Sequence, residues 1–106
     1  AYGKVRVGLD AAGKVTAFDG DVWGTAGMGG YRGAAELPYI FTKIPNTRFG
    51  MNGIRTNRAT QRAWRAPGHP QACLITMAAL EDAAAAAKMD ALEFFMLNAE
   101  LTDRPE

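Results

Sequence analysis

The stretch KVRVGLDAAGKVTAFDGDVW, residues 4–23, decides the first half of the fold. At its start, Val5, Val7 and Leu9 alternate with charged residues or glycine. Alternation with a period of two places these three side chains on one face of an extended chain. The pattern therefore predicts a strand over residues 4–9.

The next residues predict a return strand. Asp10-Ala11-Ala12-Gly13 favours a turn, because glycine takes the positive φ that a tight turn requires. A second strand over residues 14–23 completes an antiparallel hairpin, with Val15 and Ala17 expected on one face and Thr16 and Phe18 on the other.

Beyond the hairpin the chain is less regular. Five glycines within residues 24–33 predict a loop, either a plain connector or a loop that faces a cofactor, and their spacing matches no standard phosphate-binding motif. The apolar run 37–41 is expected to pack, without an assigned secondary structure. Residues 47–56 predict a further strand, with an irregularity at Gly50 or Gly53.

Two helices are expected at the end of the chain. Pro70 suits a first helical position, and residues 71–88 are rich in strong helix formers. Leu74, Met77, Ala78 and Glu81 are predicted to share a stripe, Cys73, Leu80 and Ala84 are predicted to run beside it, and most of this helix is expected to be buried. The next helix is predicted to run to about residue 98, opened by a capping box, Asp90-Ala91-Leu92-Glu93, with Met89 and Phe94 as its hydrophobic staple.

These elements define an α+β fold: an antiparallel hairpin, at least one further strand and two helices. Residues 1–106 are interpreted as a single partial domain, an internal fragment of a larger subunit. No run of about twenty apolar residues is present, so no membrane span is expected. Whether the compartment is the cytoplasm or the periplasm stays open.

Cysteine and histidine content limits the chemistry of the chain. The single cysteine, Cys73, excludes an internal disulfide and any metal cluster built on several thiolates. His69 lies four residues earlier, and two ligands do not make a zinc site. His69 is therefore interpreted as a satisfied histidine near a helix start and Cys73 as a buried thiol, and no metal ligand is predicted.

The charge is balanced overall, with twelve Lys or Arg against eleven Asp or Glu, but it is unevenly distributed. No carboxylate occurs between Leu37 and Leu80, whereas this stretch holds six cations: Lys43, Arg48, Arg55, Arg58, Arg62 and Arg65. Arginine suits phosphate recognition, and the stretch leads into a helix N-terminus that also favours an anion. Anion binding is one interpretation; pairing with carboxylates elsewhere, or simple exposure, is the other. Nucleic acid is disfavoured, because no known binding signature accompanies Trp64 and Tyr31, which could stack on bases.

The ordered motifs of the middle of the chain carry a family resemblance. Arg55-Thr56-Asn57 is followed by Gln61-Arg62-Ala63-Trp64-Arg65-Ala66-Pro67-Gly68-His69-Pro70-Gln71. Together with the hairpin, the Lys43-Ile44-Pro45-Asn46 step and the helix from Asp90, the chain resembles the molybdenum-binding subunit of the xanthine oxidase and aldehyde oxidoreductase family.

The resemblance implies a function for the larger subunit. It would oxidise an aldehyde or heterocycle with water-derived oxygen at a molybdopterin-bound molybdenum, and the cytosine dinucleotide form of the cofactor stays open. Electrons would pass to 2Fe–2S clusters and FAD on partner subunits or domains. By the same resemblance, Arg65 and Ala66 contact the cofactor and Pro67 lies beside the substrate pocket. The family's catalytic glutamate has no counterpart here, so no catalytic residue is predicted and the chain alone is expected to be inactive.

Two departures from the purine-oxidising members bear on the substrate. Pro67 stands where they have a ring-stacking Phe, and Asn52 aligns without gaps with a substrate-polarising Arg. Neither residue can replace those functions, so the loop favours an aldehyde over xanthine. The alternative to the enzyme is a small non-catalytic anion-binding or structural domain that uses the arginine-rich segment 48–65.

Overall fold

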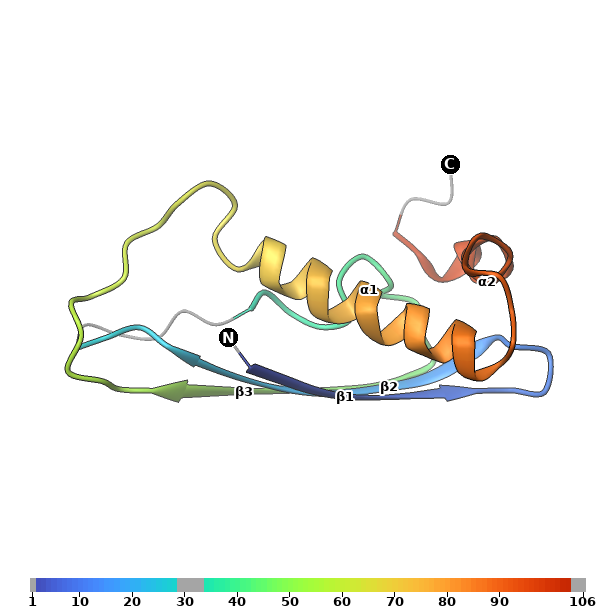
Figure 1. The fold of residues 1–106 in the computed structure, drawn as a ribbon, viewed down its shortest axis with the longest axis horizontal. Helices are drawn as coiled ribbons and strands as arrows, with labels where there is room; N and C mark the ends of the chain where they lie inside the picture. The colour runs from blue at the N-terminus through green and yellow to red at the C-terminus, as the bar shows by residue number, and fades with distance from the viewer. Residues whose placement is uncertain (1, 29–33, 104–106) are drawn as a thin grey trace.

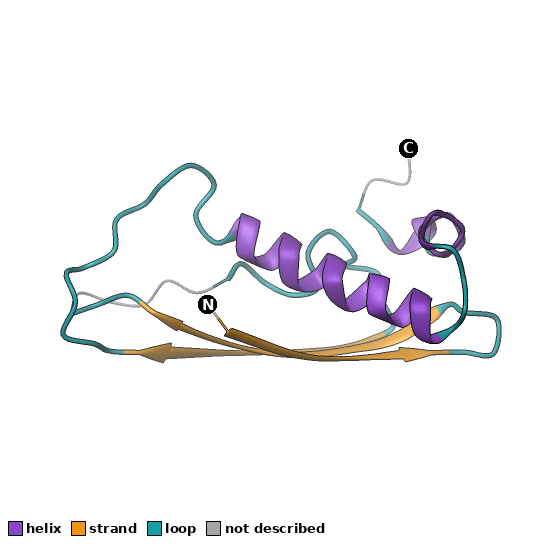
Figure 2. Ribbon diagram, in the orientation of Figure 1, coloured by secondary structure: helices purple, strands orange, loops and turns teal. Residues whose placement is uncertain are grey.

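The computed structural model describes residues 2–28 and 34–103 and confirms the predicted α+β class. Its elements follow in the order β1 (Tyr2–Leu9), β2 (Val15–Thr25), β3 (Asn46–Ile54), α1 (His69–Ala86), α2 (Ala91–Leu97) and the 3-10 helix η1 (Ala99–Leu101). The three strands form one layer, and the helices lie on one side of it (Figures 1 and 2).

The predicted hairpin is confirmed. Strands β1 and β2 are antiparallel, and Tyr2 pairs with Trp23 at the open end. In the turn, Gly13 has a φ of 88°, and the Asp10 carboxylate accepts the backbone N–H groups of Ala12 and Lys14, both at 2.9 Å. The turn is thus held by one aspartate and one glycine, as the sequence indicates.

A bulge in β2 changes which side chains face the core. Gly8 pairs with Ala17 and Leu9 pairs with Val15, so Thr16 is left without a partner on β1. One extra residue shifts the alternation, so Val15 and Phe18 are both buried. The prediction that these two residues occupy opposite faces was therefore wrong.

Strand β3 lies on the other side of β2 and runs parallel to it. Their pairing is continuous from Asn46 with Ala17 to Ile54 with Thr25, so the irregularity predicted at Gly50 or Gly53 is absent from this pairing. A parallel neighbour needs a long crossover, and residues 26–45 make it.

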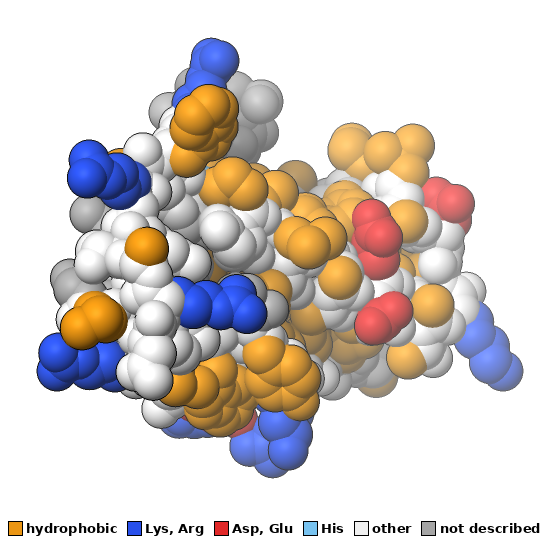
Figure 3. Space-filling view, turned by 60° about the vertical axis from the view of Figure 1, so that its left-hand side comes forward, with side chains coloured by type: hydrophobic (Ala, Val, Ile, Leu, Met, Phe, Trp, Pro, Cys, Tyr) orange, Lys and Arg blue, Asp and Glu red, His pale blue; other side chains and the backbone are white. Residues whose placement is uncertain are grey.

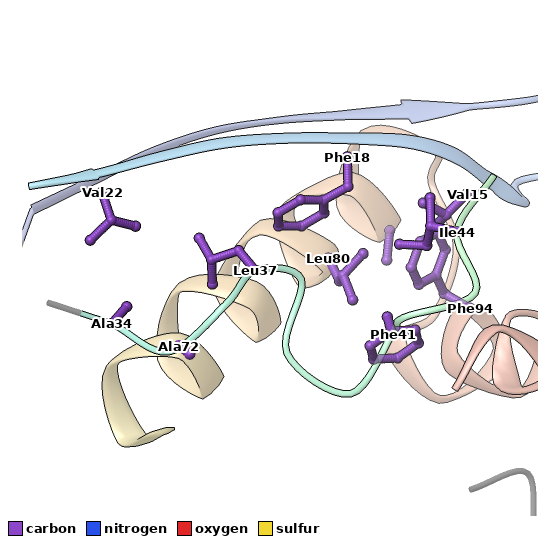
Figure 4. Close-up of a cluster of buried hydrophobic side chains, with 11 residues drawn as sticks. Val15, Phe18, Val22, Ala34, Leu37, Phe41, Ile44, Ala72, Leu80 and Phe94 are labelled. Carbon is purple, nitrogen blue, oxygen red and sulfur yellow. The ribbon is translucent and has the colours of Figure 1, made fainter. Parts of the chain in front are cut away.

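The crossover supplies part of the core. Leu37 and Phe41 are 2% and 3% exposed, which confirms that the apolar run packs. Figure 4 shows both within the cluster between the sheet and the helices, with Leu37 beside Phe18 and Phe41 near Phe94. Strand β2 continues through Gly24 to Thr25, so the predicted glycine-rich loop begins only at Ala26, and its residues 29–33 lie outside the described part.

Helix α1 packs on the sheet through a row that the sequence indicated only in part, at Leu80 and Ala84. Its four buried residues are Ala72, Thr76, Leu80 and Ala84, spaced four apart. The predicted stripe was wrong at Leu74, which is 70% exposed, and at Ala78, which is also exposed, whereas Met77 is half-buried against the core; most of the helix is not buried. Apolar residues occur on every side of this helix, so the periodicity of its sequence does not select one face. The row that packs on the sheet consists mostly of small side chains.

The predicted cap of α2 is confirmed. The Asp90 carboxylate accepts the N–H groups of Leu92 at 3.0 Å and Glu93 at 3.3 Å. Phe94 is fully buried, and Met89 packs against the same core cluster. None of the helices within residues 2–28 and 34–103 is long and apolar enough to cross a membrane.

Candidate cofactor-binding loop

The candidate site is the loop 55–68, which joins β3 to α1. In Figure 1 it arches away from the sheet at one end of the molecule. Its first half is fixed to the segment that follows β2: Met28 donates to the Arg58 carbonyl at 3.2 Å, and Gln61 donates to the Ala26 carbonyl at 3.1 Å. These two bonds hold the loop beside the end of the parallel pair β2–β3.

Gly27 lets the two segments approach closely. Its φ is 73°, and a Cβ at this position would lie 2.3 Å from the Ala59 carbonyl oxygen. No side chain fits in that space, so a glycine is required here. The glycine-rich stretch therefore does make a close backbone approach, but the backbone it approaches belongs to the candidate loop.

The second half of the loop is fixed at the start of α1. Ala66 has a φ of 53° and Gly68 a φ of 84°, and this double reversal turns the chain into the helix. The Ala66 carbonyl accepts the His69 N–H at 3.1 Å, and the Gly68 carbonyl accepts the Ala35 N–H at 2.9 Å. The conformation around Arg65 is thus set by backbone contacts on both sides.

This conformation encloses a hollow of about 380 Å³. Three of the predicted site residues, Arg65, Ala66 and Pro67, line it together, with Arg62 and Trp64 beside them. The fourth, Asn52, does not. It lies on β3 opposite Trp23, and its side-chain amide donates to the Val22 carbonyl at 3.4 Å.

The arginines of the acid-free stretch divide into two groups. Arg48 belongs to the sheet, where it contacts Asp19 at 2.6 Å and Asp21 at 2.5 Å. The other four are exposed and form no ion pair with any described residue: Arg55, Arg58, Arg62 and Arg65. Figure 3 shows basic side chains around the loop end and acidic ones toward the helical end. Arg48 thus follows the pairing interpretation, whereas the four exposed arginines are compatible with anion binding and with simple exposure.

Helix α1 adds to the positive potential of the hollow. It has 18 residues and no acidic side chain in its first turn. Pro70 has no N–H to donate, and the N–H of Gln71 has no acceptor within the described residues. Since Gln71 itself lines the hollow, this N–H and the helix dipole favour an anion there.

Some members of the hollow were not identified from the sequence. Gln61 of the loop and Gln71 of α1 also line the hollow, and Trp64 is 88% exposed. The length of the stretch without carboxylates was the one sequence signal that the candidate site extends from Gln61 to Gln71. His69 is exposed and packs edge-on against Tyr39, with ring centroids 5.6 Å apart. Cys73 is half-buried rather than buried.

The residues that line the hollow include two arginines, two glutamines and the first turn of α1, and no acidic residue is among them. Such a set of residues fits an anion that also presents hydrogen-bonding edges.

Residues 1–99 match the family model of the molybdopterin cofactor-binding domain. The chain belongs to this family and is therefore a component of a molybdenum enzyme. A search of curated proteins finds no match to it. Within the described residues, no group of three or more metal-ligating side chains is present.

Proposed function

We propose that the loop 55–68 contributes one wall of the molybdopterin site of a molybdenum hydroxylase, with Arg65 and Ala66 in contact with the cofactor. The observation that carries this proposal is the hollow, which gathers Arg65, Arg62 and the first turn of α1 without a carboxylate. Molybdopterin carries a phosphate and a pterin ring rich in hydrogen-bonding groups, which these donors complement.

Each residue has a distinct task in this proposal. Arg65 binds phosphate or pterin oxygens with its planar fork of donors, and the Gln71 N–H supports the same negative charge. Ala66, at positive φ, holds the loop in a tight turn so that the backbone approaches the cofactor. The bound molybdenum cofactor supplies the redox chemistry by which an aldehyde or heterocycle gains oxygen derived from water.

The electrons leave through other parts of the enzyme in this proposal. The rest of the molybdenum subunit encloses the cofactor, and 2Fe–2S and FAD centres on partner subunits or domains accept the electrons. The catalytic base lies outside residues 1–106, so the chain alone does not turn over substrate.

Replacing Arg65 tests the proposal. In the enzyme purified from cells that make the cofactor, Arg65→Ala is expected to lower molybdenum and pterin occupancy about tenfold or more, since a charge-assisted hydrogen bond contributes about 1.5–3 kcal/mol. The control is Arg55→Ala, at an arginine that is also exposed and without an ion pair among the described residues but does not line the hollow. It is expected to retain full occupancy. Equal occupancy in both variants would contradict the role of Arg65.

A second candidate function follows from the same unpaired arginines. Their exposure also suits a non-catalytic domain that binds an anionic partner. Metal and pterin analysis of the matured protein separates the two candidates. Near-stoichiometric molybdenum and pterin, with iron and flavin in the purified complex, favours the hydroxylase. Their absence favours the anion-binding domain.

The substrate class rests on Pro67 and Asn52, which we propose lie at the substrate pocket. Pro67 lines the hollow and offers no aromatic face to a planar purine, and the Asn52 amide is neutral. The enzyme is therefore expected to oxidise aromatic or aliphatic aldehydes at least tenfold more efficiently than xanthine, compared as kcat/KM. Comparable turnover of xanthine would contradict this assignment.

A further inference from the structure

The loop 55–68 is held in place by its backbone and not by its side chains. Every residue from 57 to 67 is exposed, and none of the loop residues belongs to the hydrophobic core cluster. No side chain of the loop forms a hydrogen bond or an ion pair with a described residue. The position of the loop therefore depends on the few backbone hydrogen bonds that it makes.

Three of these bonds join the first half of the loop to residues 26–28, which we call the latch. Besides the bonds that involve Met28 and Gln61, the Thr56 N–H donates to the Gly27 carbonyl at 3.4 Å. Ala26 is 2% exposed and Gly27 is also buried, so the latch belongs to the fixed body of the structure at the end of β2. A side chain at residue 27 would meet the backbone of the loop, so the latch closes only with glycine there.

The residues that line the hollow follow the latch directly. Residues 62–65 form no backbone hydrogen bond with a described residue, so the latch sets their position at one end and the start of α1 sets it at the other. With the latch open, the unsupported stretch would extend from Arg55 to Arg65. A binding site that is formed for only about a tenth of the time has an apparent affinity about tenfold lower, although every contact with the ligand is kept.

We propose that Gly27 is a positioning residue of the cofactor site, because the latch that it permits holds the loop in the arrangement that binds molybdopterin. Gly27 does not line the hollow, so it acts through the loop and not by contact with the cofactor. This inference rests on the proposed cofactor site and adds to it. Since coupling between two events is reciprocal, cofactor binding must also stabilise the closed latch.

The first test is Gly27→Ala in the molybdenum enzyme that contains this chain, purified from cells that make the cofactor. Its molybdenum and pterin content is expected to fall about tenfold or more, because the loop is seldom in the binding arrangement. The matched control is Gly53→Ala, at an exposed glycine in the extended backbone of β3. This control is expected to keep the full content.

A pair of substitutions at Met28 opens the latch without a change at Gly27. Met28→Pro removes the N–H that the Arg58 carbonyl accepts, whereas Met28→Ala removes the same exposed side chain and keeps the N–H. Met28→Pro is expected to lower the cofactor content as Gly27→Ala does, and Met28→Ala is expected to keep it. This pair decides the question if Gly27→Ala fails to fold.

Hydrogen exchange measures the coupling in the unsubstituted enzyme. The amides of Met28, Thr56 and Gln61 are expected to exchange about tenfold or more slowly in the loaded enzyme than in cofactor-free enzyme from cells that lack the cofactor. The amides that pair β1 with β2 are expected to change much less. A latch with a purely structural role would exchange at the same rate in both forms.

Equal exchange of the latch amides in the two forms would overturn the proposal, and so would full cofactor content in Gly27→Ala or in Met28→Pro. The variant Arg65→Ala separates this failure from failure of the cofactor site. If Arg65→Ala lowers the content and the latch variants do not, the cofactor site stands and Gly27 does not position it. If none of the three lowers the content, the proposed cofactor site is itself wrong.

Discussion

Asn98 joins the two halves of the structure at the scale of a single residue. It is fully buried after the last turn of α2. Its side-chain oxygen accepts the Val15 N–H at 2.8 Å, and its amide donates to the carbonyls of Gly13 at 3.2 Å and Phe94 at 3.0 Å. The hairpin turn and the C-terminal helix are thus held by one side chain. The sequence predicted that Asn98 lies near a helix end, but it did not indicate that its side chain joins the hairpin turn to the helix.

Removing the Asn98 amide is expected to be costly. Asn98→Leu keeps the volume but leaves the Val15 N–H and the Gly13 carbonyl without partners. A buried unsatisfied group costs about 1–3 kcal/mol, so the free energy of unfolding should fall by about 3 kcal/mol in urea denaturation. Asn57→Leu, at an exposed loop position, should change it by less than about 0.5 kcal/mol. Equal effects of the two substitutions would contradict this assignment.

At the scale of the elements, a ladder of charges crosses the outer face of the sheet. Arg6 of β1 contacts Asp19 of β2, and Arg48 of β3 contacts both Asp19 and Asp21. Hydrogen bonding to Arg6, and then to Arg48, lowers the pKa of the Asp19 carboxyl below its ordinary value of 3.8. The ladder therefore ties the parallel strand β3 and the antiparallel strand β1 to the same central residue.

The lowered pKa gives the sheet a pH dependence of known sign. Because Asp19 releases its proton more readily when folded, its ion pairs stabilise the fold above about pH 4, the range in which the unfolded carboxyl is also ionised. This stabilisation is lost as the pH falls through the folded-state pKa. Asp19→Asn should reduce stability at pH 7 and make its decline below pH 4 shallower, as followed by urea denaturation at several pH values.

Asp82→Asn is the control for this titration, since Asp82 is exposed on α1 and forms no ion pair with a described residue. It should reproduce the pH dependence of the unsubstituted chain. An acid limb that is unchanged in Asp19→Asn would show that the ladder does not govern acid stability.

The elements also show which parts of the fold could be predicted from the sequence. The hairpin turn and the cap of α2 were predictable, because Gly13 and Asp90 act within a few residues of their own positions. The direction of β3 and the first half of the buried row of α1, Ala72 and Thr76, were not, because both depend on packing between distant segments. For the candidate site, the sequence predicted that Arg65, Ala66 and Pro67 belong to one site. The contact by which Gly27 fixes their loop joins residues about thirty positions apart, and no local pattern indicates it.

At the scale of the whole molecule, the chain is extended for its size. Its radius of gyration is 15.1 Å, whereas a compact domain of this length has about 13 Å. Its accessible surface is 7135 Å², against about 5,800 Å² for a folded protein of this mass. Among residues 2–28 and 34–103, nine large apolar side chains are exposed: Tyr2, Met28, Ile40, Met51, Ile54, Trp64, Leu74, Leu92 and Met96. An excess of this kind is typical of surfaces that are covered in an assembly.

Helix α2 presents the part of this surface that is simplest to test. Leu92 and Met96 are 71% and 70% exposed and lie one turn apart, whereas Phe94 between them is buried. Replacing both with glutamine should reduce the fluorescence of an anilinonaphthalene dye bound to the chain, because such dyes report exposed apolar surface. The free energy of unfolding should change by less than about 1 kcal/mol, since neither side chain packs in the core.

Leu80→Ala provides the opposite case. Leu80 is fully buried against the sheet, so its truncation should destabilise the fold by about 2–5 kcal/mol and increase dye binding. If the double variant on α2 lost as much stability as Leu80→Ala, the outer face of α2 would be part of the core of this chain. If dye binding fell while stability was kept, that face would be available for the remainder of the molybdenum enzyme to cover.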